Sequence, residues 1–89
     1  MYVLIVYDIG EKRVNKVLKL CRRYLDWVQN SVFEGEITKA NLERLKSQLK
    51  HVIETEEDSI RIYKLRTENG FNLEILGVDK KQVLGDGII

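Results

Sequence analysis

The sequence predicts one α+β domain over residues 1–89, a ferredoxin-like sandwich in which two helices cover one face of an antiparallel sheet. Two amphipathic helical patterns alternate with segments rich in β-branched and aromatic residues. Because each helix lies between two such segments, both connections place their helix on the same face. The 89 residues, 44% hydrophobic and 33% charged, suit a single compact domain of marginal stability. Dimerisation would therefore stabilise it.

The N-terminal half of the pattern begins with a strand at residues 2–7. This apolar run has no alternation, which is typical of a central strand covered on both faces, and it ends at Asp8. A helix is predicted over residues 11–26, because the apolar residues fall at i, i+3, i+4, i+7 and i+11 and share one face. These residues are Val14, Val17, Leu18, Cys21 and Leu25.

The middle of the chain predicts a second strand and a second helix. Residues 27–37 are rich in β-branched and aromatic types and indicate a strand. A ferredoxin-like chain requires two strands between its helices, so this segment would have to break into two pieces. Thr38 is a favourable N-cap for a helix that fades at the acidic run 54–58. Its apolar stripe consists of Leu42, Leu45, Leu49, Val52 and Ile53.

The C-terminal part predicts two antiparallel strands, at residues 59–65 and 71–75. Asn69 and Gly70 between them form the turn signal of a β-hairpin. The chain closes on Ile88 and Ile89, an unusual place to expose two β-branched residues. We expect both to pack against another surface.

Composition excludes several classes of protein. The single cysteine, Cys21, excludes an internal disulfide and leaves no Cys/His pair for zinc, which fits a reducing cytoplasm. The apolar run at residues 2–7 is too short to span a membrane and lacks the basic lead of a signal peptide. We therefore expect a cytoplasmic protein without a membrane partner.

Basic residues gather on the first predicted helix. The formal net charge is only +1, so affinity for nucleic acid requires charge concentrated on one face. Lys12, Lys16, Lys19 and Arg23 recur at steps of four, three and four, and Arg13 and Arg22 lie beside them. No acid interrupts positions 12–25. This stripe is either a solvated outer face or a phosphate-binding surface that contacts the backbone without reading bases.

Asp8, at the carboxyl end of the predicted central strand, has two interpretations. Aspartate is a favoured N-cap, and a helix begins within a few residues. Alternatively, Asp8 binds a metal ion. Magnesium is usually held by one or two carboxylates plus waters, and the chain offers no second acid at motif spacing. A two-fold axis could supply a second Asp8, and the pair could then hold a cation that activates water.

The aromatic residues of the predicted strands also have two interpretations. Aromatic side chains spaced along strands are more often core or interface than stacking platforms for bases. The residues concerned are Trp27, Phe33, Tyr63 and Phe71.

Several motifs resemble those of the CRISPR-associated protein two family, small spacer-acquisition proteins that are also described as metal-dependent endoribonucleases. The most specific is the run VQNSVFEG at residues 28–35. The run YDI at residues 7–9 with Arg13 after it, the run DSIRIY at residues 58–63 and the closing DGII at residues 86–89 extend the match over nearly the whole chain.

The resemblance implies a ferredoxin-like homodimer whose C-terminal segment, with Ile88 and Ile89, packs on the partner's sheet. It implies that Asp8 is the metal-ligating and catalytic residue for magnesium-dependent cleavage of RNA or DNA. It also implies a role in antiviral defence, in which the dimer bridges two dimers of the larger CRISPR integrase and contacts DNA through basic residues. Arg13 is the best matched of these, and we expect Lys16, Arg22 and Arg23 to contact phosphates as well.

The resemblance leaves three matters open. Trp27 stands where the family usually has a basic residue, so it is either an interface residue or a stacking group. A non-catalytic scaffold that spaces integrase subunits along DNA is one alternative function, and a toxin-like ribonuclease of similar fold is another. The substrate is single-stranded RNA, double-stranded DNA or both.

Overall fold

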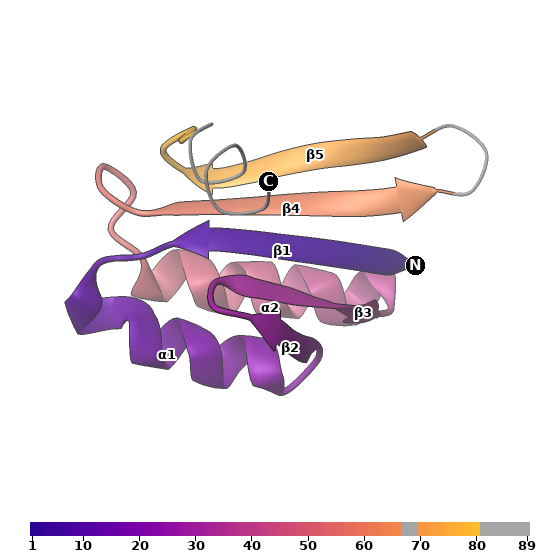
Figure 1. Cartoon of the computed structure of the whole chain (residues 1–89), viewed down its shortest axis with the longest axis horizontal. Coiled ribbons are helices and arrows are strands. Elements are labelled where there is room, and N and C mark those ends of the chain that lie inside the picture. The colour runs from indigo at the N-terminus through magenta and orange to yellow at the C-terminus, as the bar shows by residue number, and fades with distance from the viewer. Residues whose placement is uncertain (67–69, 81–89) are drawn as a thin grey trace.

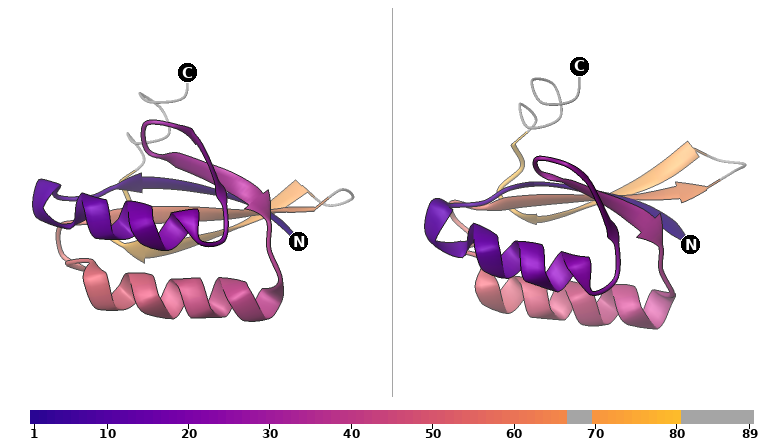
Figure 2. Two further views of the ribbon diagram at one scale, coloured as in Figure 1. Left: turned by 90° about the horizontal axis from the view of Figure 1, so that it is seen from below. Right: turned by 60° about the horizontal axis from the view of Figure 1, so that its bottom comes forward.

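A computed structural model of the chain describes residues 1–66 and 70–80, so the expectation for Ile88 and Ile89 lies outside the described residues. The elements are β1 (Tyr2–Asp8), α1 (Glu11–Arg22), β2 (Asp26–Gln29), β3 (Val32–Glu36), α2 (Lys39–Val52), β4 (Ser59–Arg66) and β5 (Gly70–Gly77). The sheet order is β2-β3-β1-β4-β5, and all neighbouring strands are antiparallel. Both helices lie on one face of the sheet (Figures 1 and 2). The predicted ferredoxin-like α+β fold is confirmed.

The single strand predicted at residues 27–37 is wrong, because the chain turns back at Asn30 and Ser31. The turn requires a residue with a positive φ angle, and Asn30 has φ +29°. Asparagine tolerates that conformation better than most residues. The turn separates β2 from β3 and supplies the second strand that the fold requires between its helices.

The helices differ in how well their ends were predicted. α1 ends at Arg22, four residues before the predicted end at residue 26. The apolar spacing continues to Leu25 because this buried side chain lies against Gly35 of β3, although it is no longer helical. The cap of α2 is confirmed, since Thr38 Oγ1 accepts a hydrogen bond from the Asn41 amide at 3.1 Å.

The main core lies between the sheet and the helices. It is formed by alternate residues of the central strands and by the stripes of both helices, including Ile5, Phe33, Ile62, Val17 and Leu45, each 0% exposed. β1 is central, as predicted, but the helices cover only one of its faces. No helix in the described part of the chain is long and apolar enough to cross a membrane.

The second face of the sheet, which we call the open face, carries a smaller apolar cluster. Val6, Val32 and Tyr63 are buried there, with Leu4 packed against them. β4 and β5 pair as predicted and extend this face, although residues 67–69 between them lie outside the described residues.

Candidate functional site

Asp8 ends β1 on the open face, because it follows Leu4 and Val6 at the two-residue period of a strand. Its side chain is 53% exposed, and Lys80 Nζ lies 3.3 Å from its Oδ2. The interpretation of Asp8 as a helix cap is wrong, since the N-cap of α1 is Gly10. The carboxylate of Asp8 is therefore available to a ligand, and a positive charge already lies beside it.

Ser59 lies directly opposite Asp8 in the ladder between β1 and β4. Opposite residues of an antiparallel pair point to the same face, so both side chains belong to the open face. Ser59 is 1% exposed, and its Oγ finds no hydrogen-bond partner among the residues that the structure describes. A buried polar atom without a partner is costly, and it is a candidate to bind a ligand or ordered water.

One carboxylate and one hydroxyl are suitable oxygen ligands for a hard cation such as Mg²⁺, but two ligands do not complete its coordination. Within residues 1–66 and 70–80, no group of three or more His, Cys, Asp or Glu side chains could hold a metal ion. A complete site at Asp8 would thus need ligands from water, from substrate or from a second copy of the chain.

The open face is also an exposed apolar surface. Beyond the buried cluster, three large side chains on this face are strongly exposed: Leu65 by 42%, Phe71 by 56% and Leu73 by 40%. Phe71 lies edge-on to Tyr63, with ring centroids 5.2 Å apart. A contiguous apolar patch of this kind marks an association surface.

The basic stripe of α1 lies on the other side of the sheet. Lys12, Lys16, Lys19, Arg22 and Arg23 are all exposed, and none forms an ion pair in the part of the chain that the structure describes. The structure therefore does not bring Asp8 and the basic residues onto one face. Phosphate contacts by Lys16, Arg22 and Arg23 stay predictions.

Arg13 has protein partners, which the sequence interpretation missed. Its Nε donates to Asp58 Oδ2 at 2.6 Å and its Nη2 to Asp58 Oδ1 at 2.9 Å, and Nη2 also lies 3.0 Å from Glu57 Oε2. Asp58 is 1% exposed and accepts two further bonds, from the amides of Gly10 at 2.9 Å and Glu54 at 2.8 Å. The pair ties the β1–α1 loop to the α2–β4 loop. Phosphate binding by Arg13 stays a prediction.

The signal that could have found this pair was the acidic run 54–58, which we interpreted as the end of the second helix, although its last residue, Asp58, also begins the run DSIRIY. Asp58 and Arg13 are 45 residues apart, so spacing along the chain gives no hint of their contact. The pairing follows from the crossovers, which bring the starts of α1 and β4 to the same end of the sheet.

Asp58 makes the stability of the fold dependent on pH. The bidentate bond from Arg13 lowers the pKa of Asp58 to about 2 from its ordinary 3.8, outweighing the effect of burial. A lowered pKa stabilises the fold above pH 4, and this contribution is lost as the pH falls from about 4 to about 2. We expect wild type to lose about 2 kcal/mol more than Asp58→Asn over this range, measured by urea unfolding. Equal losses would contradict the assignment.

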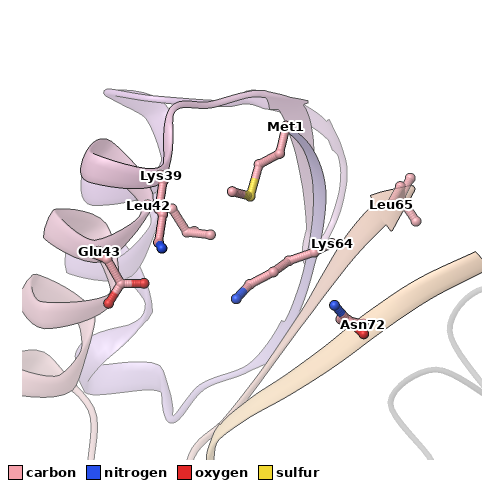
Figure 3. Close-up of a pocket in the computed structure, with 7 residues that line it drawn as sticks. All are labelled: Met1, Lys39, Leu42, Glu43, Lys64, Leu65 and Asn72. Carbon is pink, nitrogen blue, oxygen red and sulfur yellow. The ribbon is translucent and has the colours of Figure 1, made fainter. Parts of the chain in front are cut away.

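Two other features lie apart from the site. Burial raises the pKa of the Cys21 thiol to about 12, so it is protonated and shielded rather than a nucleophile. A pocket of about 320 Å³ lies at the start of β1, the opposite end of the strand from Asp8 (Figure 3). It is lined by Met1, Lys39, Leu42, Glu43, Lys64, Leu65 and Asn72. Its charges are mixed, and it includes no residue of the basic stripe.

Comparison with known proteins identifies close relatives. Residues 1–72 match the family described as CRISPR associated protein Cas2. A protein of Thermotoga maritima named CRISPR-associated endoribonuclease Cas2 is 51% identical over 89 residues, 100% of this chain and 99% of that protein. A protein of the same name from Pyrococcus furiosus is 52% identical over 83 residues, 93% of this chain and 95% of that protein.

Solved structures agree with the sequence comparison. A crystal structure of cas2 superimposes with a TM-score of 0.72 at 49% identity, covering 91% of each chain. Streptococcus pyogenes Cas2 at pH 6.5 superimposes with a TM-score of 0.69 at 40% identity, covering 76% of this chain and 89% of that one.

Proposed function

Since the chain belongs to the CRISPR associated protein Cas2 family, we propose that it is a CRISPR adaptation protein and a magnesium-dependent endoribonuclease, with Asp8 as its metal ligand and catalytic residue. Relatives about half identical to it carry the name endoribonuclease. The observation that carries the proposal is the exposed Asp8 carboxylate at the end of the central strand, on the same face as an exposed apolar patch.

The proposed active unit is a homodimer associated through the open face. Packing the exposed side chains of β4 and β5 against a second copy removes apolar surface from water, which is the main driving force for such interfaces. A two-fold axis would let two copies of Asp8 share one site. This arrangement would supply a second carboxylate at Asp8, where the described residues form no group of three or more possible metal ligands.

The proposed chemistry divides between the metal and the protein. When bound, Mg²⁺ supplies charge stabilisation at the scissile phosphate and a more acidic water. The carboxylate of Asp8 would hold the cation, and Lys80 Nζ, 3.3 Å from Asp8 Oδ2, would have to move away, because its positive charge repels a cation at that carboxylate. The buried Ser59 Oγ, which has no hydrogen-bond partner among the described residues, would offer a second oxygen on the same face.

The proposed partners are the larger CRISPR integrase and nucleic acid. The basic stripe on α1 would follow the phosphate backbone, with a salt-sensitive and largely sequence-independent affinity. Because this stripe lies across the sheet from Asp8, binding of DNA and cleavage of RNA are separable activities. The same separation supports a second candidate function, a non-catalytic scaffold that bridges integrase dimers.

The test is cleavage of labelled single-stranded RNA and of duplex DNA by the purified chain. We expect cutting of the RNA with Mg²⁺, none with chelator, and recovery when Mg²⁺ is restored in excess. Cutting that persists in chelator would contradict the metal-dependent mechanism. A clean preparation that cuts neither substrate would leave the scaffold as the better account.

The dimer makes a separate prediction about stability. Association through the open face stabilises the folded chain by mass action, so the melting temperature rises with protein concentration. We expect this rise in scans over a hundredfold range of concentration. Leu73→Asp, which places a charge on the open face, should abolish it. If the protein were a monomer whose melting temperature did not change with concentration, the proposed site with two paired copies of Asp8 would be refuted.

A further inference from the structure

The indole of Trp27 is a large apolar group exposed on the short edge strand β2. It is 53% exposed, and its Nε1 donates a hydrogen bond to the carbonyl oxygen of Asn30 at 3.1 Å. The bond satisfies the polar edge of the ring and links it to the turn between β2 and β3. An indole held in this way presents a flat apolar surface at little cost in conformational entropy.

Two arginines, Arg22 and Arg23, stand five and four residues before this indole, at the end of α1. The Asn30 carbonyl also accepts a hydrogen bond from the Tyr7 hydroxyl at 3.3 Å. Burial raises the pKa of Tyr7, and the nearby positive charge of Arg22 acts in the opposite direction. The indole nitrogen and the Tyr7 hydroxyl therefore meet at one backbone carbonyl, and α1, which ends at Arg22, contacts β2. Arg22 and its neighbour Arg23 are exposed at the end of α1.

The acidic side chains of the same hairpin point the other way. Trp27 lies opposite Phe33, whose side chain is in the core on the helix side of the sheet. Asp26 lies opposite Glu34, which pairs with Leu4 and so belongs to the open face. Because side chains alternate along a strand, Trp27 shares its side of the sheet with α1 and not with these acids. A flat partner that also carries negative charge complements this surface.

We propose that Trp27 stacks an unpaired base of a single-stranded nucleic acid whose phosphates lie on Arg22 and Arg23. The inference rests on the proposed function and specifies how the nucleic acid is held. An internal base pair of a duplex keeps both faces of each base stacked, so this site favours a single strand or a frayed end. If Trp27 instead binds a protein, the affinity of the chain for a nucleic-acid strand should not depend on whether that strand carries bases.

The experiment uses the fluorescence of Trp27, which is the only tryptophan in the chain. The wild-type chain is titrated in chelator, which prevents metal-dependent cutting, with oligothymidylate of about 15 nucleotides or with an abasic strand of equal length. Anisotropy of the labelled strands reports binding in parallel. We expect both strands to bind, thymidylate about tenfold more tightly, and only thymidylate to quench Trp27 strongly.

The outcomes separate the stacking site from the proposed function. Thymidylate that binds without changing the fluorescence overturns stacking and leaves nucleic-acid binding intact. A failure of both strands to bind overturns the inference together with the nucleic-acid part of the proposed function.

Variants test whether the aromatic ring acts directly. We expect Trp27→Leu to weaken thymidylate binding about tenfold with no effect on the abasic strand, Trp27→Tyr to retain most of the affinity, and the neighbouring Val28→Ala to change neither. Arg23→Gln should weaken the binding of both strands and reduce the steepness of log affinity against log salt by about one. Trp27→Leu should leave that steepness unchanged. If Trp27→Leu reduced the affinity for both strands equally, Trp27 would only support the hairpin and would not stack a base.

Discussion

Asp8→Asn is expected to lower the rate of magnesium-dependent RNA cleavage by at least about 100-fold, because it removes the charged ligand of the proposed cation. The substitution keeps the size of the side chain. Asp8 is half exposed and its contact with Lys80 is a surface ion pair, so the free energy of unfolding should change by less than about 1 kcal/mol. Initial rates on labelled single-stranded RNA, with wild type and variant purified identically, measure the effect.

The matched control for Asp8 is Glu36→Gln. Glu36 pairs with Tyr2 at the start of β1, the opposite end of the open face from Asp8, and its side chain is 78% exposed. We expect it to cleave at the wild-type rate. Metal binding has an independent readout, since Mg²⁺ should raise the melting temperature of wild type and of Glu36→Gln but not of Asp8→Asn. Equal cleavage by Asp8→Asn and wild type would refute the catalytic assignment.

Asp58→Ala is expected to destabilise the fold by about 3–5 kcal/mol, the usual cost of breaking a buried ion pair by removing one partner. The carboxylate accepts hydrogen bonds from Arg13 and from the amides of Gly10 and Glu54. The substitution removes this acceptor from all three donors. A loss of this size is a large share of the stability of a small domain. Urea unfolding at neutral pH, with midpoint and slope determined together, measures it.

Glu57→Gln is the control for Asp58, since Glu57 contacts the same guanidinium from the surface. Its side chain is 69% exposed, so the expected cost is below about 1 kcal/mol. Arg13→Leu should destabilise less than Asp58→Ala, because the two amide bonds to Asp58 survive it. If Asp58→Ala unfolded no more easily than Glu57→Gln, the buried pair would not be what joins the two loops.

Most of the fold could be predicted because its signals are periodic. The stripes of both helices, the Thr38 cap and the pairing of residues 59–65 with 71–75 depend on local spacing, and the structure confirms them. The break at Asn30 and Ser31 was foreseen only through the requirements of the fold, since both flanking segments have strand-forming residues. Leu25 misled the prediction of the end of α1 because burial, and not helicity, sets its position.

The candidate site was predicted less completely, because it depends on contacts between distant segments. Asp8 could be singled out as a strand-end acid, but only the helix boundary shows that it is not a cap. Ser59 lies in the run DSIRIY, which was matched to the family without a site role, and its relation to Asp8 comes from strand register. Arg13 was chosen as a basic surface residue, yet its guanidinium is held by a carboxylate 45 residues away.

The placement of Asp8 and the α1 stripe on opposite sides of one sheet has an evolutionary consequence. A substitution at position 8 changes neither the side chains of α1 nor the apolar side chains of the open face. A lineage could therefore lose the proposed catalysis through a single codon and keep the surfaces proposed to bind DNA and partners. Enzymes and their inactive descendants would then share the same architecture, and only residue 8 would tell them apart.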